Sequence, residues 1–297
     1  MSHILTLAVD RASSSLTEAT IARVRDAIQG RSPVPLSPGE AVDIPCAGPP
    51  DMDAVAAALD GAPVDAIATR ARGRRKGLLV ADMDSTIVTT ETLDEIAAFA
   101  GLKDRIAAIT RRAMNGELDF AAALRERVGM LKGLSVEVLE QTWQATVLMP
   151  GARELVATMR AHNATTALVS GGFSFFTSRV AETVGFHLHR SNVLLDDGRA
   201  LTGEVAEPIL DKDAKLSTLR DLAAARGLKM AATLAVGDGA NDLPMILEAG
   251  LGVAFRAKPV VAARARARLE HATLRALLFA QGYRCGDIVG GLSANPR

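Results

Sequence analysis

Four short runs of apolar residues, separated by long helical stretches, constrain the fold of this chain more than any other feature. They are GLLVAD at 77–82, TTALVSGG at 165–172, ATLAVGDG at 232–239 and LGVAF at 251–255. Strands that are apolar throughout, rather than at alternate positions, belong to parallel sheets that are covered by helices on both faces. The sequence therefore predicts an α/β fold with a doubly wound parallel sheet.

The connection between the first two runs is too long for a simple crossover. Its residues, about 90–149, contain four successive helical stretches: ETLDEIAAFAGL, KDRIAAITRRAMNG, DFAAALRERVGMLKG and SVEVLEQTWQATV. A helical block of this size inside one connection predicts a cap that stands above the sheet. Farther along, NVLLDDGRALTGEV at 192–205 predicts a β-hairpin, because Asp-Asp-Gly lies between two apolar stretches.

Residues 1–75 are expected to form a small α/β module of their own, in front of a larger domain at 76–297. Apolar and helical stretches alternate there around a Pro/Gly-rich segment, in the order β-α-β-α-β. The segment RARGRRKG at 70–77 separates the two parts. Its five positive charges have no aromatic residues between them, which favours a solvated linker over a nucleic-acid contact.

Charge and composition narrow the classes of partner. Basic and acidic residues balance at 34 each among 297 residues, so the net charge favours neither nucleic acid nor an anionic membrane. No window reaches about 18 uninterrupted apolar residues, and the N-terminus has no signal-peptide pattern. Only Cys46 and Cys285 occur, without a CxxC partner, so no disulfide framework is indicated. We expect a cytoplasmic protein that acts on a small molecule, without nucleic-acid or membrane partners.

Polar residues and glycines stand at the ends of three of the four runs, where the predicted strands end. They are Asp82 and Asp84, then Ser170 with Gly171 and Gly172, then Asp238, Asn241 and Asp242. Ligands of open parallel sheets bind beyond the carboxyl ends of the strands, which meet at one edge. Carboxylates gathered there repel one another unless a cation lies between them, and an all-oxygen site suits Mg2+. A carboxylate nucleophile, a second carboxyl and a hydroxyl beside glycine amides suit phosphoryl transfer.

Four motifs of the chain resemble, in order and approximate spacing, those of the haloacid dehalogenase (HAD) superfamily. They are DMDST at 82–86, Ser170 in VSGGF, Lys215 in DKDAKLSTL and GDGAND at 237–242. Together they are similar to the phosphoserine phosphatases of that superfamily, over about residues 77–290. The resemblance implies a HAD-like sheet with a helical cap inserted after the first strand. It also implies a Mg2+-dependent hydrolase of O-phospho-L-serine, the last step of serine biosynthesis.

The resemblance assigns roles at the sheet edge. Asp82 is implied to be the nucleophile that forms an aspartyl phosphate, and Asp84 the general acid and then the base. Mg2+ is implied to bind the side chains of Asp82 and Asp238 and the backbone carbonyl of Asp84, with Asp242 behind them. The groups implied to hold or adjoin the phosphoryl oxygens are Ser170, the amide of Gly171, Lys215 and Asn241. Lys212 is an alternative to Lys215, although the spacing to GDGAND favours Lys215.

Substrate choice is expected to lie in the cap. Glu91 is implied to recognise the substrate's ammonium group; its alternative role is a charge at the start of the first cap helix. Arg127 is implied to bind the substrate carboxylate in a bidentate contact; its alternative is a surface charge, like Arg125 and Lys132. Phe120, two helical turns before Arg127 on the same face, either closes over the substrate or belongs to the core.

Three functional alternatives remain open on the sequence. The first keeps the chemistry and changes the substrate: a phosphatase or phosphotransferase for another small phosphomonoester, such as phosphohomoserine or a phosphorylated sugar. The second concerns the N-terminal module, which weakly resembles the ACT-like domains of some phosphoserine phosphatases and is thus a candidate serine sensor. A structural element or a homodimer contact is the other interpretation of that module. The third, a purely structural protein, gives no reason for the acidic strand ends.

Overall fold

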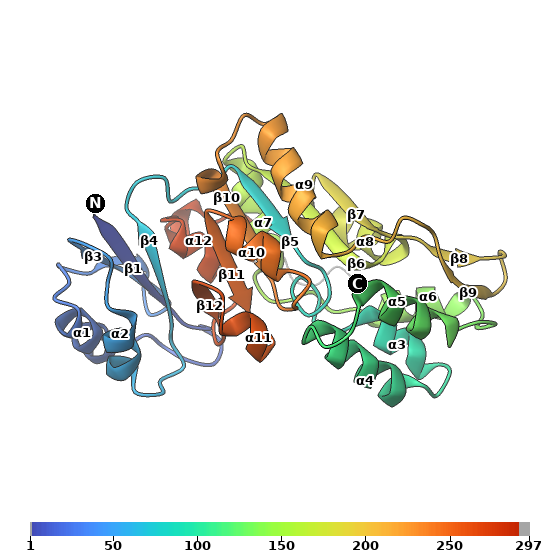
Figure 1. The fold of residues 1–297 in the computed structure, drawn as a ribbon. Helices are drawn as coiled ribbons and strands as arrows, with labels where there is room; N and C mark the ends of the chain where they lie inside the picture. Colours follow the sequence, from blue (N-terminus) through green and yellow to red (C-terminus); the bar gives the residue numbers. More distant parts are fainter. Residues whose placement is uncertain (1, 291–297) are drawn as a thin grey trace.

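A six-stranded parallel sheet lies at the centre of the computed structural model, which describes residues 2–290 (Figure 1). The strand order is β12-β11-β10-β5-β6-β7. The strands are β5 (Leu78–Ala81), β6 (Thr165–Phe173), β7 (Leu188–Asn192), β10 (Thr233–Gly237), β11 (Leu251–Phe255) and β12 (Ala267–Leu269). The four apolar runs form β5, β6, β10 and β11, and their side chains are mostly buried. This confirms the predicted doubly wound sheet.

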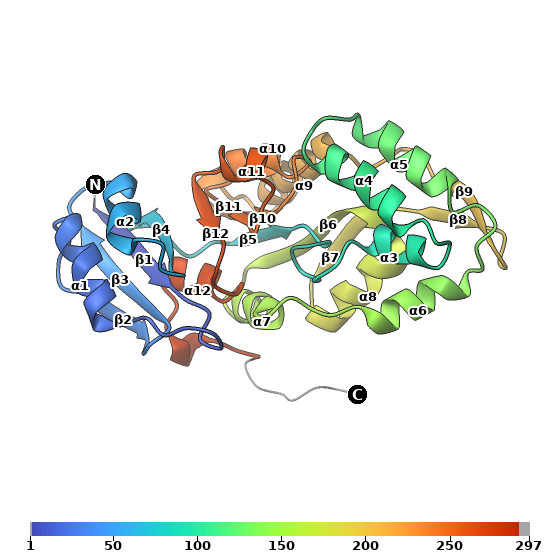
Figure 2. The same ribbon diagram turned by 90° about the horizontal axis from the view of Figure 1, so that it is seen from below.

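Helices cover both faces of the central sheet (Figure 2). One face carries α9 (Lys212–Ala225), α10 (Leu243–Glu248) and α11 (Pro259–Ala262). The other carries α7 (Ala152–Ala161), α8 (Ser174–Val184) and α12 (Ala276–Ala280), while η1 (Met230–Ala232) and η2 (Cys285–Asp287) are short connections. Leu78 and Val80 pack with Leu219 of α9, whereas Leu79 and Ala81 belong to the core on the other face. Because both faces are buried, these strands need apolar residues at every position.

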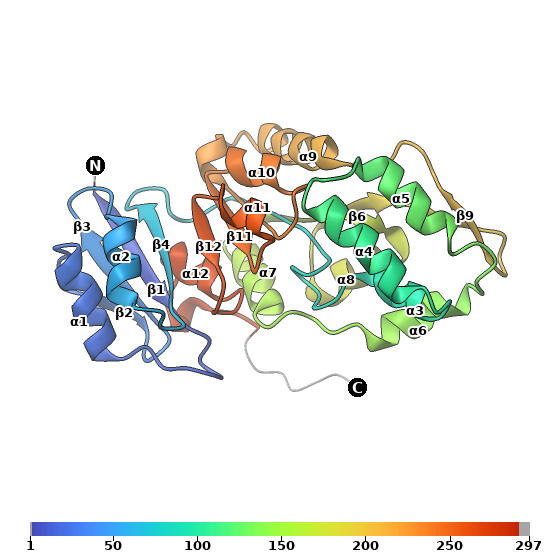
Figure 3. The same ribbon diagram turned by 60° about the horizontal axis from the view of Figure 1, so that its bottom comes forward.

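The predicted helical cap follows β5 and stands beyond the carboxyl end of the sheet (Figure 3). Its helices are α3 (Thr92–Ala98), α4 (Lys103–Met114), α5 (Phe120–Gly129) and α6 (Glu137–Ala145). Two adjacent crossings join the cap to the sheet domain, where Val88 pairs with Leu148 in an isolated antiparallel bridge. Within residues 2–290, every helix is too short or too polar to traverse a bilayer.

The predicted hairpin forms an additional part of the cap. Its strands are β8 (Leu194–Asp196) and β9 (Leu201–Val205), which pair antiparallel. Leu201 donates its amide to the carbonyl of Leu134 at 2.8 Å and accepts from the amide of Gly133 at 2.9 Å. The hairpin is therefore attached to the turn that separates α5 from α6, far from it in the sequence.

The N-terminal module is a four-stranded antiparallel sheet of order β2-β3-β1-β4. Its elements are β1 (His3–Ala8), α1 (Glu18–Ala27), β2 (Val34–Ser37), β3 (Ala41–Cys46), α2 (Met52–Leu59) and β4 (Asp65–Arg70). The order β-α-β-β-α-β is the ferredoxin-like arrangement. The expected order lacked one strand, because the Pro/Gly-rich segment folds into the β2–β3 hairpin. Pro35 is compatible with β2 because this strand lies at the edge of the sheet, where a missing N–H is tolerated.

The module packs against the central domain through the sheet face that α1 and α2 leave free. Helix α12 contacts β1, β3 and β4 and lies between the two sheets (Figures 1 and 2). Side chains of both parts belong to one buried core: Ala8, Leu36, Ala41, Ile67, Leu277 and Phe279. Because the core is shared, a domain boundary near residue 75 stays a prediction.

Charged groups are buried at this contact. Arg74 lies in the segment expected to be a solvated linker, yet it donates to Asp43 at 2.5 and 2.9 Å and to the carbonyl of Phe279 at 3.1 Å. Arg275 of the central domain pairs with Glu40 of the module at 2.8 and 3.1 Å. Lys76 is buried as well, so the expectation of a solvated linker was wrong for Arg74 and Lys76, because a run of charges does not reveal which partners folding will bring to it. It holds for the other three charges of the segment, which are exposed: Arg70, Arg72 and Arg75.

We expect the substitution Arg74→Met to lower the free energy of unfolding by about 3–5 kcal/mol, because it leaves Asp43 buried without its countercharge. The two side chains are only 12% and 8% exposed. Arg75→Met is the matched control: its pair with Asp287 is 50% and 39% exposed. The control should cost less than about 1 kcal/mol. Urea unfolding measures both, and equal losses would contradict the burial of the Arg74 pair.

Candidate active site

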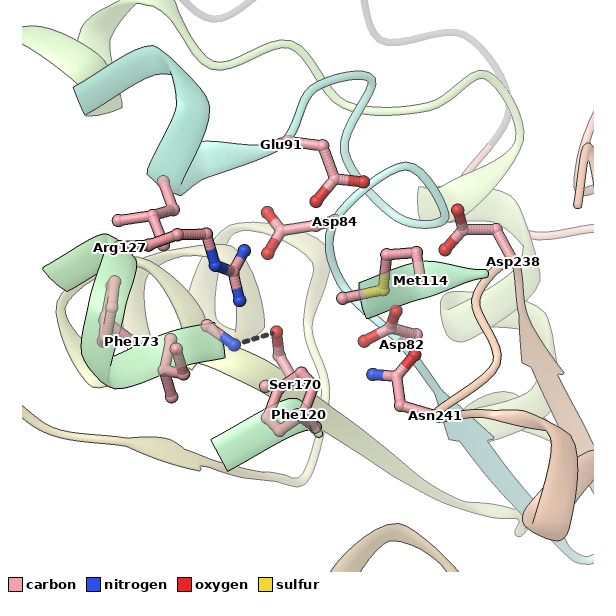
Figure 4. Close-up of a pocket in the computed structure, with 14 residues that line it drawn as sticks. Asp82, Asp84, Glu91, Met114, Phe120, Arg127, Ser170, Phe173, Asp238 and Asn241 are labelled. Atoms are coloured by element: carbon pink, nitrogen blue, oxygen red, sulfur yellow. Dashed lines mark hydrogen bonds between the residues drawn. The ribbon is translucent and has the colours of Figure 1, made fainter. Parts of the chain in front are cut away.

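The structure brings the predicted site residues together at the carboxyl edge of the central sheet (Figure 4). All of them except Lys215 and Asp242 line one cavity between the sheet and the cap: Asp82, Asp84, Glu91, Phe120, Arg127, Ser170, Gly171, Asp238 and Asn241. Lys215 and Asp242 lie directly behind this lining and are buried. Residues from β5, β6, β10 and the cap helices therefore face the same space.

Lys215 is a completely buried cation that links two carboxylates. From the first turn of α9, its Nζ donates to Asp82 Oδ1 and to Asp242 Oδ1, at 2.6 Å each. Burial by itself lowers the pKa of Lys215, but Asp242 and Asp82 outweigh it and raise the pKa above its ordinary value. Lys215 is therefore a fixed positive charge beside Asp82.

Three carboxylates form a group suited to a divalent cation. One oxygen from each of Asp82, Asp238 and Asp242 lies within 4.8 Å of the other two. Burial, followed by the charge of Asp242, raises the pKa of Asp82 to about 7, even though Lys215 opposes the shift. Burial and the charges of Glu91, Asp242 and Asp82 raise the pKa of Asp238 in the same direction. The positive charges of the protein therefore do not fully balance the negative charges of these three carboxylates.

One buried oxygen of this group supports the same conclusion. Oδ2 of Asp238 receives no hydrogen bond from residues 2–290, although Nζ of Lys258 lies 3.4 Å away. Oδ1 of Asn241, nearby at the same edge, is buried and also without a partner. Leaving such atoms unsatisfied is costly, and hard cations with oxygen ligands satisfy them. The donor set therefore fits Mg2+.

Asp84 has a different environment from Asp82. Its Oδ1 accepts a hydrogen bond from the amide of Thr92 at 3.1 Å, at the start of α3. Burial, followed by the negative charges of Glu91 and Asp82, raises the pKa of Asp84 well above its ordinary value. A carboxyl group whose pKa is raised holds its proton more readily, which suits a general acid. Asp82 and Asp84 are therefore in different surroundings: Asp82 is bonded to the cation Lys215, whereas Asp84 is bonded to a backbone amide.

The end of β6, after Val169, presents the hydroxyl group of Ser170 and two glycines to the cavity. Ser170 Oγ accepts from the amide of Gly172 at 2.9 Å, which leaves its own proton for another acceptor. The carbonyl of Gly171 accepts from Asn192 Nδ2 at 2.8 Å, so the end of β7 holds the end of β6 in place. A Cβ at Gly171 would lie 2.5 Å from Cζ of Phe120. Only glycine permits this close approach of the cap to the sheet edge.

The cap contributes two opposite charges to the cavity. Glu91 Oε1 accepts from Ser85 Oγ at 2.8 Å, and its side chain makes no capping hydrogen bond to α3. Arg127 of α5 is 3% exposed, so the alternative of a surface charge was wrong for it, whereas Arg125 is exposed and pairs with Glu207. Burial lowers the pKa of Arg127, while nearby carboxylates oppose the shift. The two side chains lie on the cap side of the cavity (Figure 4).

Phe120 lines the cavity and also packs against the main core, so its position is compatible with both of its expected roles, and the contact with substrate stays a prediction. Sequence reasoning missed four further lining residues: Leu93, Met114, Leu124 and Phe173. The apolar ones gave no signal, because an apolar helical residue that faces a cavity has the same pattern as one that faces the core. Met114 also accepts a hydrogen bond at its carbonyl from the amide of Ala240, at 2.9 Å, which joins the cap to the sheet edge.

The cavity is small, with a volume of about 30 Å³. That is far below the roughly 300–1,000 Å³ of a typical small-molecule pocket. The cap is therefore in a closed position, which leaves too little space for a molecule as large as a phosphorylated amino acid.

Known proteins are similar to this chain in sequence and in architecture. The family model for haloacid dehalogenase-like hydrolase matches residues 79–247. A phosphoserine phosphatase from Streptococcus thermophilus is 46% identical over 190 residues, which cover 64% of this chain and 88% of that protein. A phosphoserine phosphatase from Mycobacterium tuberculosis is 43% identical over 215 residues, which cover 72% of this chain and 53% of that protein. The chain thus spans about half the length of the second relative.

A solved structure resembles the chain over nearly its full length. It is an unliganded probable phosphoserine phosphatase from Vibrio cholerae, with a TM-score of 0.75 and 33% identity. The match covers 95% of this chain and 86% of that one, so it includes most of the N-terminal module. With the motifs, the parallel sheet and these relatives in agreement, the chain belongs to the haloacid dehalogenase-like hydrolases and, among them, to the phosphoserine phosphatase family.

Proposed function

We propose that this protein is a Mg2+-dependent phosphatase that hydrolyses O-phospho-L-serine to L-serine and phosphate, the last step of serine biosynthesis. One observation carries the proposal: a single cavity combines the Asp82–Asp84 pair with buried Arg127 and with Glu91. Phosphoserine bears a phosphate, a carboxylate and an ammonium group, and the cavity offers a complementary partner to each. The activity named for the relatives supports the same substrate.

In the first step, a carboxylate oxygen of Asp82 attacks the phosphorus atom. The bond between phosphorus and the serine oxygen breaks, and an aspartyl phosphate forms. Asp84 gives its proton to the departing oxygen, so that serine leaves with a neutral hydroxyl group. Lys215, 2.6 Å from Asp82, orients the nucleophile and offers positive charge to the phosphoryl oxygens, and the Ser170 hydroxyl donates a hydrogen bond to them.

In the second step, Asp84 acts as the base. Its carboxylate takes a proton from a water molecule whose oxygen attacks the phosphorus, and the bond to Asp82 breaks. Inorganic phosphate leaves and Asp84 is protonated again. Burial and the charges of Glu91 and Asp82, which raise the pKa of Asp84, favour this protonated state at the start of each cycle.

The residues that would hold Mg2+ are the side chains of Asp82 and Asp238 and the backbone carbonyl of Asp84, with Asp242 behind them. When bound, the ion offsets the repulsion between an anionic nucleophile and an anionic phosphate. Asp242 has a supporting role, because its Oδ2 accepts hydrogen bonds from the amides of Asp238 and Gly239 at 3.2 and 3.0 Å. These bonds hold the GDGAND loop in place.

The cap has to open for substrate to enter, because the closed cavity of about 30 Å³ does not accommodate it. Closure then excludes bulk water from the phosphoryl group and brings Glu91 and Arg127 to the amino acid part of the substrate. Serine sensing by the N-terminal module, a homodimer and a cytoplasmic location stay predictions.

Phosphate release tests the proposal most directly. We would compare O-phospho-L-serine, O-phosphohomoserine, O-phosphoethanolamine and p-nitrophenyl phosphate, each with Mg2+ and with EDTA. We expect kcat/KM for phosphoserine to exceed that for phosphoethanolamine by about 100-fold, since leaving a buried charge unpaired costs roughly 2–5 kcal/mol. Equal or better activity on phosphohomoserine would assign another substrate. Absence of activity on all four compounds would reject the phosphatase proposal.

A further inference from the structure

The hydroxyl group of Thr110 links Arg127 to a buried carboxylate. Thr110 lies on α4 and its Oγ1 accepts from Arg127 Nη1 at 2.9 Å. The same hydroxyl donates to Oδ1 of Asp94, on α3, at 2.7 Å. All three side chains are buried. Helices α3, α4 and α5 are thus joined by one short chain of hydrogen bonds that lies entirely within the cap.

The direction of these bonds follows from the chemistry of the groups. A threonine hydroxyl has one proton and two lone pairs, whereas a guanidinium group only donates. Because Arg127 donates to Thr110, the single proton of the hydroxyl is available for Asp94. The carbonyl of Ile106 is the other acceptor in reach, at 3.1 Å, but it is farther away and uncharged. The order is therefore guanidinium to hydroxyl to carboxylate.

Two bonds hold the plane of the guanidinium group and leave most of its donors free. Nε of Arg127 donates to the carbonyl of Ala123 at 3.1 Å, and Nη1 donates to Thr110. A guanidinium group has five N–H donors, and the other three have no hydrogen-bond partner among residues 2–290. Figure 4 shows the guanidinium group facing the cavity beside Asp84. A bidentate contact with a carboxylate depends on the orientation of this plane.

The interposed hydroxyl also determines what Arg127 has available for a ligand. Asp94 makes no direct ion pair with Arg127 within 4.0 Å among the described residues, because Thr110 stands between them. A direct pair would occupy two donors of the guanidinium group with a carboxylate of the protein itself. With the hydroxyl between them, Asp94 still provides a compensating negative charge for a buried cation. The donors that face the cavity remain free.

We propose that Thr110, held by Asp94, is a positioning residue that orients Arg127 and thereby sets the preference of the site for substrates with a carboxylate. This inference rests on the proposed function, in which Arg127 binds the carboxylate of phosphoserine. Thr110 does not line the cavity, so its effect on the substrate acts through Arg127.

The test measures kcat and KM of Thr110→Val with O-phospho-L-serine and with O-phosphoethanolamine, which lacks the carboxylate. Valine keeps the shape of threonine and removes the hydroxyl. We expect KM for phosphoserine to rise about tenfold, the effect of one lost hydrogen bond to a charged group. Both constants for phosphoethanolamine should change by less than about twofold. Thr110→Ser, which keeps the hydroxyl group, should restore most of the preference.

Thr142→Val is the matched control, because Thr142 is a buried threonine of the cap helix α6 whose hydroxyl has no hydrogen-bond partner among the described residues. It should leave both substrates unaffected. Thermal unfolding of each variant, with Thr110→Ala as a second variant, separates selectivity from loss of fold.

The outcomes distinguish this inference from the proposed function. The positioning role is rejected if Thr110→Val changes kcat/KM by the same factor for both substrates, or leaves both values unchanged. The phosphatase assignment stands in either case. If the wild-type protein shows no preference for phosphoserine over phosphoethanolamine, the carboxylate contact of Arg127 is rejected as well, and both proposals lose their basis.

Discussion

Asp82→Asn is expected to abolish phosphate release from O-phospho-L-serine, with a loss of at least about a thousandfold in kcat. The amide cannot replace the carboxylate oxygen that attacks phosphorus, and it also removes one proposed ligand of Mg2+. Asp221→Asn, an exposed substitution on α9, is the matched control and should keep full activity. Steady-state phosphate release measures both variants, and substantial turnover by Asp82→Asn would reject Asp82 as the nucleophile.

The fold of this variant is expected to remain intact. Burial and Asp242 raise the pKa of Asp82 to about 7 from an ordinary value of 3.8. When folding raises the pKa of an acid, the free energy of unfolding falls as the pH rises from the ordinary pKa to the raised one. At neutral pH the ionised Asp82 therefore destabilises the folded state. Asparagine is uncharged and so removes this destabilising effect, while Lys215 keeps its hydrogen bond to Asp242. The midpoint of thermal unfolding should therefore not fall; a large fall would indicate lost structure instead of lost chemistry.

Removal of divalent cations is expected to have the other large effect. EDTA should stop turnover and lower the midpoint of thermal unfolding, and added Mg2+ should restore both. Without a cation, Asp82, Asp238 and Asp242 are buried close together with Lys215 as the only fully buried positive charge bonded to them among residues 2–290. At a Mg2+ concentration 100 times the Kd, binding adds about 2.7 kcal/mol to the free energy of unfolding.

This stabilisation should depend on pH. The pKa values of Asp82 and Asp238 are raised in the metal-free protein, so protons relieve part of the repulsion at pH 5.5. Above about pH 7 Asp82 is ionised, and the cation meets the full negative charge. The Mg2+-dependent rise in the unfolding midpoint should therefore be larger at pH 8 than at pH 5.5. Asp238→Asn should lose most of this rise, and an unchanged rise in that variant would contradict the proposed metal site.

The central sheet was predictable because each of its inner strands is a local pattern. A strand buried on both faces must be apolar throughout, so β5, β6, β10 and β11 are visible as runs in the sequence. Strand β12 was not predicted: its three residues include exposed Arg268. It lies at the edge of the sheet, where pairing with β11 rather than an apolar run determines it. The β2–β3 hairpin was missed because Pro and Gly mask a strand that tertiary packing supports.

The residues of the candidate site could be predicted from the sequence, but the hydrogen bonds between them could not. Sequence patterns placed Asp82, Ser170 and Asp238 at strand ends, which topology brings to one edge. The bonds of Lys215 to two carboxylates and the link from Arg127 through Thr110 to Asp94 join segments that are distant in the sequence. No local pattern indicates such links, because each depends on how separate helices pack.

The sequence by itself determined the layered sheet, the helical cap and the candidate groups at the strand ends, since hydrophobic periodicity and loop motifs are local properties. Only the tertiary structure decided which of several similar charges became buried. Arg125 and Arg127 are two positions apart on α5, and roughly 200° of helical rotation turns one to solvent and the other to the cavity. Arg74 and Arg75 are adjacent, yet Arg74 is largely buried in its ion pair with Asp43, whereas Arg75 is exposed. Desolvation and charge pairing depend on every neighbour in space, so they arise only when the helices and sheets have packed.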